Sequence, residues 1–336
     1  MNRGTRTAPD GGTGKTPAGG ARTASDGGTR TASDGGTRAA PAGGARAAVQ
    51  PGTRTVVERR RRHTLYFLEW SAGQRPVHLD TDIDMTRVQE HRAAAKARGT
   101  RYSVVAYLLH ATGRALARHP EANAVMAPGW PSLLRAPRIV RFPGVTAKLA
   151  LDRPVGGERT VLSALVPDLE TATLDDIQRH IDRYRGEQAA DLPEFKGVRA
   201  LGGLPVLLGR LAFAGALRDP RKRPGVFGTV SVSSLGHSTV DGFHSAGGTA
   251  VTLCAGRIAD RPVVRDGAVT VAPVMRLGLT FDHRVIDGAA AAELLTDLRH
   301  TMEACDDLSC AEDPGQDPRG ADRDHRSPRG LEPSPR

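Results

Sequence analysis

The residues best suited to chemistry lie in one short string, Phe281-Asp282-His283-Arg284-Val285-Ile286-Asp287-Gly288. Neutral imidazole is the side chain best matched to accepting a proton near neutral pH. Asp287 follows His283 by four residues, close enough in sequence to orient the imidazole or to brace the local loop. Such a pair can activate a hydroxyl or a thiol as a nucleophile, so the string predicts a general base at His283.

The flanking segments predict how this string is held. Residues 271–280 alternate as a strand does, and residues 289–302 carry apolar side chains at helical spacing. His283 is therefore expected where a strand passes into a helix, with Gly288 supplying the backbone freedom of a tight turn. A structural alternative stays open from spacing alone: His283 could be a hydrogen-bonded turn residue and Asp287 a helix N-cap.

The wider string resembles the active-site signature of the dihydrolipoamide acyltransferases, the catalytic core subunits of 2-oxo acid dehydrogenase complexes. It is more distantly similar to the His-x-x-x-Asp motif of chloramphenicol acetyltransferases and peptide-synthetase condensation domains. Three further segments resemble motifs of the same family and occur in the family's order: Pro76 to Leu79 with Asp82 to Thr86, His119 to Ala124, and Gly228 to Gly236.

The resemblance implies a chloramphenicol-acetyltransferase-like fold that assembles as a homotrimer. It implies that His283 is the general base, that Ser233 stabilises the oxyanion, and that Asp287 orders the loop and the imidazole. In this family the histidine and the serine of one active site come from neighbouring chains. The co-substrate would be a coenzyme A thioester.

The chain also departs from the family pattern. Acyltransferases of these complexes normally carry lipoyl domains with a swinging lysine, whereas residues 1–61 contain one lysine, Lys15, and no apolar core. No lipoyl lysine is evident, so a lipoyl-bearing protein acting in trans is the expected partner. The loop after Ser233 is unusually polar, and its residues His237, Asp241 and His244 are candidates for lining the entrance.

Composition divides the chain into three parts. Residues 1–61 repeat a Gly-Gly pair with a period of eight and lack large apolar side chains, which predicts a disordered arm. Residues 62–305 carry the periodic apolar pattern of a globular domain, which the resemblance implies is the acyltransferase catalytic domain. Residues 306–336 lack this pattern and are predicted to be a disordered tail. Residues 1–62 have a net charge of +8, so most of the total of +10 belongs to the arm.

Several other functions are not expected. Gly11 to Thr16 is similar to a phosphate-binding loop, but Pro9 occupies its first glycine position and no strand precedes it. The run Arg59 to Arg62 has no interleaved aromatic side chains, so nucleic acid is not expected as a partner. No apolar stretch is long enough to span a membrane, and none is expected as a partner. Three cysteines form no even framework, which favours the cytoplasm, and no metal set is complete.

Strands mixed with helices predict a two-layer α/β domain with a mixed sheet and helices on one side. The expected strands are residues 77–83, 139–142, 146–151, 161–166, 226–232, 248–258 and 271–280. The expected helices are residues 85–98, 104–118, 174–184, 201–217 and 289–302. Asp84, Ser103 and Thr173 are the expected N-caps, and Asp266-Gly267 is the expected hairpin turn.

The function predicted from the sequence is acyl transfer between coenzyme A and a thiol, hydroxyl or amine acceptor. His283 would act as the base and Ser233 as the oxyanion donor. The alternative is a non-catalytic trimeric scaffold related to the cores of 2-oxo acid dehydrogenase complexes.

Overall fold

The computed structural model describes residues 59–127, 136–155, 158–184 and 192–305. The tail at 306–336, with Cys310, and all but the last three residues of the arm at 1–61 lie outside these ranges. A six-stranded sheet has the order β1-β8-β7-β6-β4-β5, and β2 pairs with β3 in a separate ribbon. The strands are β1 (Pro76–Asp84), β2 (Ala124–Ala127), β3 (Arg138–Arg141), β4 (Ala147–Val155), β5 (Glu158–Val166), β6 (Val230–Ser234), β7 (Val251–Arg265) and β8 (Ala268–Asp282).

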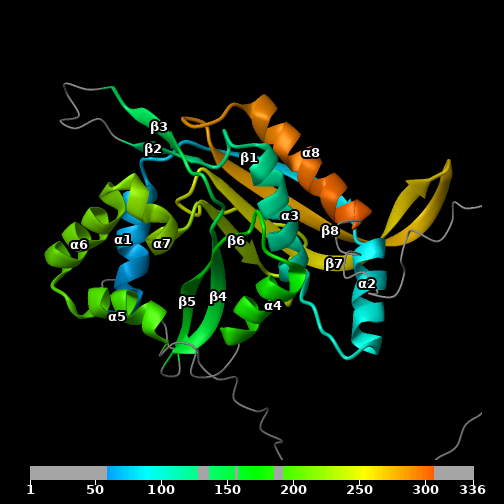
Figure 1. The fold of residues 1–336 in the computed structure, drawn as a ribbon, viewed down its shortest axis with the longest axis horizontal. Coiled ribbons are helices and arrows are strands. Elements are labelled where there is room, and N and C mark those ends of the chain that lie inside the picture. Colours follow the sequence, from blue (N-terminus) through cyan, green and yellow to red (C-terminus); the bar gives the residue numbers. More distant parts are fainter. Residues whose placement is uncertain (1–58, 128–135, 156–157, 185–191, 306–336) are drawn as a thin grey trace, which may run out of the picture. The chain divides into compact units, whose positions relative to one another are not determined.

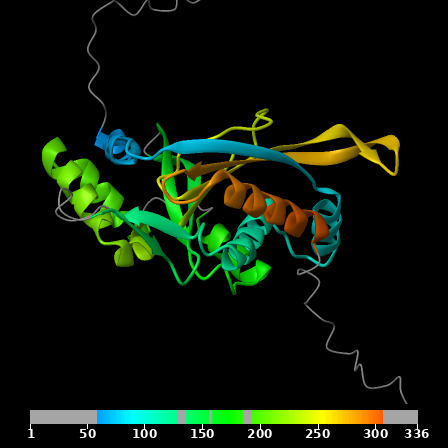
Figure 2. The same ribbon diagram turned by 90° about the horizontal axis from the view of Figure 1, so that it is seen from above.

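Helices cover one face of this sheet (Figures 1 and 2). The α-helices are α1 (Arg62–Ser71), α2 (Thr86–Ala97), α3 (Val104–Arg118), α4 (Leu174–Arg183), α5 (Lys196–Gly203), α6 (Val206–Arg218), α7 (Arg223–Phe227) and α8 (Gly288–Ala304). Short 3-10 turns are η1 (Arg59–Arg61), η3 (Pro193–Phe195) and η4 (Pro220–Lys222). The predicted two-layer α/β architecture with a mixed sheet is confirmed, since β6 runs parallel to β4 and β7 while the other pairs are antiparallel.

The main core lies between the sheet and the helices α3, α4 and α8. All five apolar positions predicted for the last helix are buried: Ala291, Leu294, Leu295, Leu298 and Met302. They pack in one cluster with alternate residues of β8, among them Leu277, Leu279 and Phe281. The apolar face of α8 thus packs on the apolar face of β8. This packing holds the end of β8 against the start of α8.

Local capping signals are also found in the structure. Ser103 accepts a hydrogen bond from the Ala106 N–H at 3.3 Å, and Thr173 forms a capping box with Asp176. The expected N-cap at Asp84 is off by one residue, because Met85 occupies that position. Asp84 still accepts from the Thr86 N–H at 3.0 Å, so its carboxylate satisfies an N–H group at the helix start.

Two sequence predictions are wrong and one strand was missed. The expected single helix at 201–217 is two helices, α5 and α6, because the backbone is extended at Leu204 and Pro205. The expected strand at 226–232 begins only at Val230, since Val226 and Phe227 end the short helix α7. The ribbon strand β2 was not predicted. None of the helices in the described ranges combines the length and apolarity that a membrane crossing requires.

The loop between β6 and β7 lies against the face of the sheet that the helices leave open. Glycines on the sheet permit this approach: a Cβ at Gly256 would meet the Asp241 carbonyl oxygen at 1.9 Å, and one at Gly278 would meet that of Phe243 at 2.6 Å. Asp241 pairs with Arg257 at 2.6 Å, and His244 Nε2 lies 3.2 Å from the Leu79 carbonyl oxygen. The polar loop is therefore fixed to β1, β7 and β8.

Candidate active site

His283 directly follows the last residue of β8, as the sequence predicts. Its backbone N–H donates to the Arg75 carbonyl at 2.9 Å, which ties the turn to the residue before β1. Its side chain is 49% exposed, and Nε2 makes no hydrogen bond to another described residue. The half-exposed imidazole can therefore be reached from solvent.

Asp287 stands further from the imidazole than a hydrogen bond allows. Its Oδ1 is 3.7 Å from His283 Nδ1, and its side chain is 90% exposed. Asp287 holds the N-cap position of α8, but its side chain makes no capping hydrogen bond. Gly288 has no positive φ and open space where a Cβ would stand, so the expectation that this turn needs a glycine is wrong.

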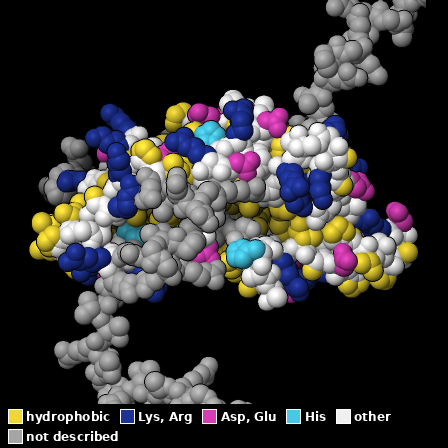
Figure 3. Space-filling model, turned by 90° about the horizontal axis from the view of Figure 1, so that it is seen from below, with side chains coloured by type: hydrophobic (Ala, Val, Ile, Leu, Met, Phe, Trp, Pro, Cys, Tyr) yellow, Lys and Arg dark blue, Asp and Glu magenta, His cyan; other side chains and the backbone are white. Residues whose placement is uncertain are grey.

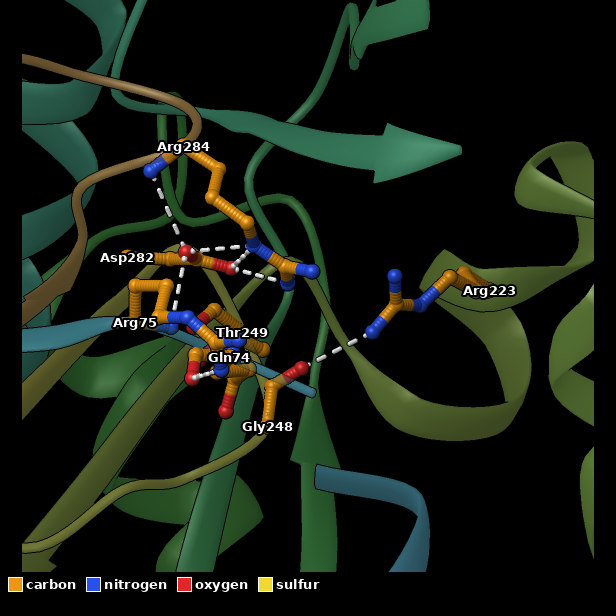
Figure 4. Close-up of polar contacts among 7 residues, drawn as sticks. All are labelled: Gln74, Arg75, Arg223, Gly248, Thr249, Asp282 and Arg284. Atoms are coloured by element: carbon orange, nitrogen blue, oxygen red, sulfur yellow. Dashed lines mark hydrogen bonds and ion pairs between the residues drawn. The ribbon is translucent and has the colours of Figure 1, made fainter. Parts of the chain in front are cut away.

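The turn is held instead by the residues on either side of His283. The buried carboxylate of Asp282 accepts from Arg284 Nη2 at 2.6 Å and from Arg284 Nε at 2.9 Å, and from the Arg75 N–H at 3.2 Å (Figure 4). Burial raises the pKa of Asp282, but the hydrogen bonds and charge of Arg284 outweigh it and the net pKa is lowered. Asp282 therefore stays ionised and keeps the turn in one conformation.

Ser233 lies on β6, far from His283 in the same chain. It pairs with Cys254 of β7, which pairs with Gly278 of β8, five residues before His283. With about 3.3 Å per residue along a strand and about 4.8 Å between strands, the two residues lie roughly 19 Å apart. Ser233 is half-buried, and its Oγ makes no hydrogen bond within the described part of the chain. One chain alone thus does not bring the predicted base and oxyanion donor together.

Two buried basic side chains, Lys148 and Arg223, lie at the same end of the sheet as His283. Neither of them was predicted from the sequence. Lys148 donates through Nζ to the Gly247 carbonyl, and this nitrogen lies 3.7 Å from the centroid of the Phe227 ring. Arg223 is 4% exposed and donates from Nη2 to the Gly248 carbonyl at 2.8 Å. These contacts fix the start of β7, where the Ala250 carbonyl accepts from the Asp282 N–H at 2.8 Å.

Figure 4 shows this chain of polar contacts running from Arg223 through Gly248 and Thr249 to the turn around Asp282 and Arg284. Gln74 links the two ends, because its Nε2 donates to the Thr249 carbonyl at 3.0 Å. No local pattern marks Lys148 as buried. Lys148 stands between Ala147 and Leu149 in the strand β4. The same neighbours could surround a lysine whose side chain is exposed to solvent.

The electrostatics of Lys148 predict an unusual pH dependence of stability. Burial, with a smaller effect of the nearby Arg223 charge, lowers its pKa from 10.5 to about 7. Between pH 7 and 10.5 the unfolded chain binds this proton and the folded chain does not, so stability rises with pH. Below pH 7 both forms are charged and the folded state carries the full penalty, about 5 kcal/mol at 1.36 kcal/mol per pKa unit.

Lys148→Met is therefore expected to unfold at a higher temperature than the wild type at pH 6. The gain should shrink as pH rises and vanish near pH 10.5, because the lysine is then neutral in both states. Ser231 Oγ still donates to the Gly247 carbonyl at 3.0 Å, so the substitution leaves that oxygen satisfied. Melting curves of both proteins from pH 6 to 10 test this. A variant that is less stable by a constant amount at every pH would contradict it.

Besides His283, the described residues offer the Cys254 thiol and possible metal ligands as candidates for chemistry. Burial raises the pKa of the Cys254 thiol to about 12, so it is not a thiolate at neutral pH. Within the described ranges, no three His, Cys, Asp or Glu side chains are grouped so that they could hold a metal ion.

Comparison with known proteins agrees with the fold and the turn. Residues 225–310, which include Ser233, His283 and Asp287, match the model of the 2-oxoacid dehydrogenases acyltransferase (catalytic domain) family. The predicted resemblance to this catalytic domain is thereby confirmed. In the described part of the chain, no lipoyl domain accompanies it.

Curated relatives match the chain over short segments. The dihydrolipoyllysine-residue acetyltransferase component of the pyruvate dehydrogenase complex of Bacillus subtilis is 49% identical over 47 residues, which are 14% of this chain and 11% of that protein. The component from Staphylococcus aureus is 38% identical over 74 residues, which are 19% of this chain and 17% of that protein. The chain thus matches less than a fifth of the length of either relative.

Solved structures extend the likeness in fold to most of the chain. The probable dihydrolipoamide acetyltransferase of Listeria monocytogenes superposes with a TM-score of 0.55 at 19% identity, covering 76% of this chain and 96% of that one. The Azotobacter vinelandii dihydrolipoamide acetyltransferase gives 0.56 at 22% identity, covering 76% and 93%. In that enzyme, the roles of a serine, a histidine and an asparagine in the catalytic mechanism were investigated.

Proposed function

We propose that the chain is an acyltransferase that moves an acyl group between coenzyme A and a thiol of the dihydrolipoyl type. The observation that carries this proposal is His283, exposed at the end of β8 with Nε2 open, in a turn fixed by the Asp282–Arg284 pair. The match of residues 225–310 to the acyltransferase catalytic domain supports the same chemistry.

The proposed reaction uses the side chains of the chain itself. His283 Nε2 takes the proton of the acceptor thiol while its sulfur attacks the carbonyl carbon of the acyl-coenzyme A. The tetrahedral oxyanion accepts a hydrogen bond from Ser233 Oγ. On collapse the bond between carbonyl carbon and coenzyme A sulfur breaks, and the imidazolium returns its proton to the departing thiolate.

This reaction requires a second copy of the chain. His283 and Ser233 are roughly 19 Å apart within one chain at strand spacings, so one hydroxyl and one imidazole from the same chain cannot contact one tetrahedral centre. We infer that neighbouring chains of a homotrimer supply them. A separate lipoyl-bearing protein is the proposed acyl acceptor or donor.

The test of activity is a panel of acyl-coenzyme A esters incubated with dihydrolipoamide. Chromatography should show free coenzyme A and acyl-dihydrolipoamide appearing in equal amounts. Hydrolysis of the thioester without transfer, or no consumption of any ester, would contradict the proposed function.

The shared site predicts complementation between two inactive variants. Co-expressed His283→Ala and Ser233→Ala chains should recover up to about one quarter of wild-type activity, since randomly mixed trimers combine an intact histidine and an intact serine in that fraction of sites. Each variant expressed alone is the control. Failure to complement in trimers shown by light scattering to contain both chains, or a stable and fully active monomer, would exclude the shared site.

A further inference from the structure

The outward face of α6 carries apolar side chains that no other described element covers. Leu207, Leu208 and Leu211 are 67%, 52% and 61% exposed. At 100° per residue they lie on the side of the helix opposite Gly209 and Leu217, which are buried. We call these three leucines the α6 face. Figures 1 and 2 show α6 at the edge of the described structure, on the far side of α1 from the sheet.

The contacts of α6 with α1 come from the other side of the helix. The inner side of α6 packs on α1, where a Cβ at Gly209 would meet the Tyr66 ring at 2.6 Å. Phe213 adds an edge-on contact with Trp70, with ring centroids 6.4 Å apart. More than half of each leucine of the α6 face remains exposed outside this packing.

Basic residues flank these leucines along the chain, on α5, at the end of α6 and on η4. Residues 196–223 contain seven Lys and Arg residues and a single acidic residue, Asp219, a net charge of +6. Six of the basic residues are exposed. One of them, Arg210, pairs with Glu69. The other five form what we call the basic rim: Lys196, Arg199, Arg218, Arg221 and Lys222. Figure 3 shows hydrophobic and basic side chains together at this end of the molecule.

The positive charge of the basic rim indicates which kind of partner can bind to this surface. A symmetric contact between two copies of the chain would bring two basic rims together, which like-charge repulsion opposes. An anionic lipid surface offers phosphates to the basic rim and a hydrocarbon boundary to the leucines. A helix with leucines on one side and Lys or Arg around them is typical of a helix that lies in the plane of a membrane interface.

We propose that the α6 face and the basic rim bind the chain to the surface of an anionic membrane. α6 has 13 residues, too few to span a bilayer, and lies on the surface. The sequence excluded a membrane partner because no stretch could span one. Surface binding needs only the outward leucines and the rim, which become visible once α6 is packed on α1.

Vesicle flotation with the full chain tests this proposal. The wild type should float with vesicles of phosphatidylglycerol and phosphatidylcholine and remain unbound with phosphatidylcholine alone. The triple variant Leu207→Ser, Leu208→Ser, Leu211→Ser should lose at least about tenfold in the bound fraction, since the apolar contact is removed. Charge reversal by Arg218→Glu, Arg221→Glu and Lys222→Glu should abolish binding, because the rim then repels the lipid.

A matched control removes three exposed valines from the β7–β8 hairpin: Val264→Ser, Val269→Ser and Val271→Ser. These side chains are 73%, 76% and 69% exposed, so comparable apolar surface is lost elsewhere. The control should float as the wild type does. Melting temperatures and coenzyme A release in the absence of lipid should stay unchanged in the leucine variant, which separates surface binding from the proposed activity.

Three results would overturn the proposal. One is undiminished flotation of the leucine variant, which would assign binding to the basic residues 1–62. Another is equal loss in the valine control. The third is a change in the molar mass of the leucine variant by light scattering, which would assign the α6 face to contact between chains.

Discussion

Replacement of His283 by alanine is expected to lower acyl-transfer turnover by roughly two to four orders of magnitude, the usual contribution of a positioned general base. The imidazole is half exposed, and its ring centroid lies 5.5 Å from that of Phe281. The imidazole is not itself part of the buried core. The Asp282–Arg284 pair and the apolar face of α8 hold the turn without it. The fold should therefore survive the substitution.

The measurement is coenzyme A turnover together with circular dichroism and melting. His300, exposed on α8, provides a matched control, and His300→Ala should keep wild-type turnover. A folded, trimeric His283→Ala protein that works at the wild-type rate would remove the catalytic role and leave the scaffold as the function of this domain.

Replacement of Ser233 by alanine is expected to lower kcat by about a hundredfold or more with little change in KM. An oxyanion contact forms mainly in the transition state, so its loss does not weaken binding of the ground state. Ser233 Oγ has no hydrogen-bond partner among the described residues, so its loss leaves no buried group unsatisfied. Stability should change little.

The neighbouring Ser234 is the control for this prediction. Its Oγ accepts from the Gly236 N–H at 3.3 Å, a local turn contact, and Ser234→Ala should keep wild-type kcat. A Ser233→Ala protein with unchanged kcat, or with a raised KM as its only defect, would contradict the oxyanion role.

Short-range patterns in the sequence were sufficient to predict several features of this fold. Helical spacing predicted every buried position of α8, and the capping residues Ser103 and Thr173 marked the starts of α3 and α4. Asp266-Gly267 marked the hairpin turn, and both residues adopt positive φ there. Each of these signals acts within a few residues, so no knowledge of the rest of the fold was needed.

Features that depend on contacts between residues far apart in the chain were predicted wrongly or missed. The apolar run at 201–217 predicts one helix, whereas the structure has two, and Leu207 and Leu211 are largely exposed. Gly288 looked necessary for the turn after His283, but the turn is held by the Asp282 and Arg284 side chains. Lys148 has no neighbour in sequence that predicts burial, because Phe227 and Gly247 reach it from far along the chain.

The candidate site shows the same division. The sequence alone identified His283, Asp287 and Ser233 by their resemblance to a family motif, and tertiary structure decided what each can contact. The order β6-β7-β8 and the register through Cys254 and Gly278 set Ser233 apart from His283. Strand order and register arise from hydrogen bonds between segments that are far apart in the chain. No local sequence pattern therefore predicts the distance between Ser233 and His283.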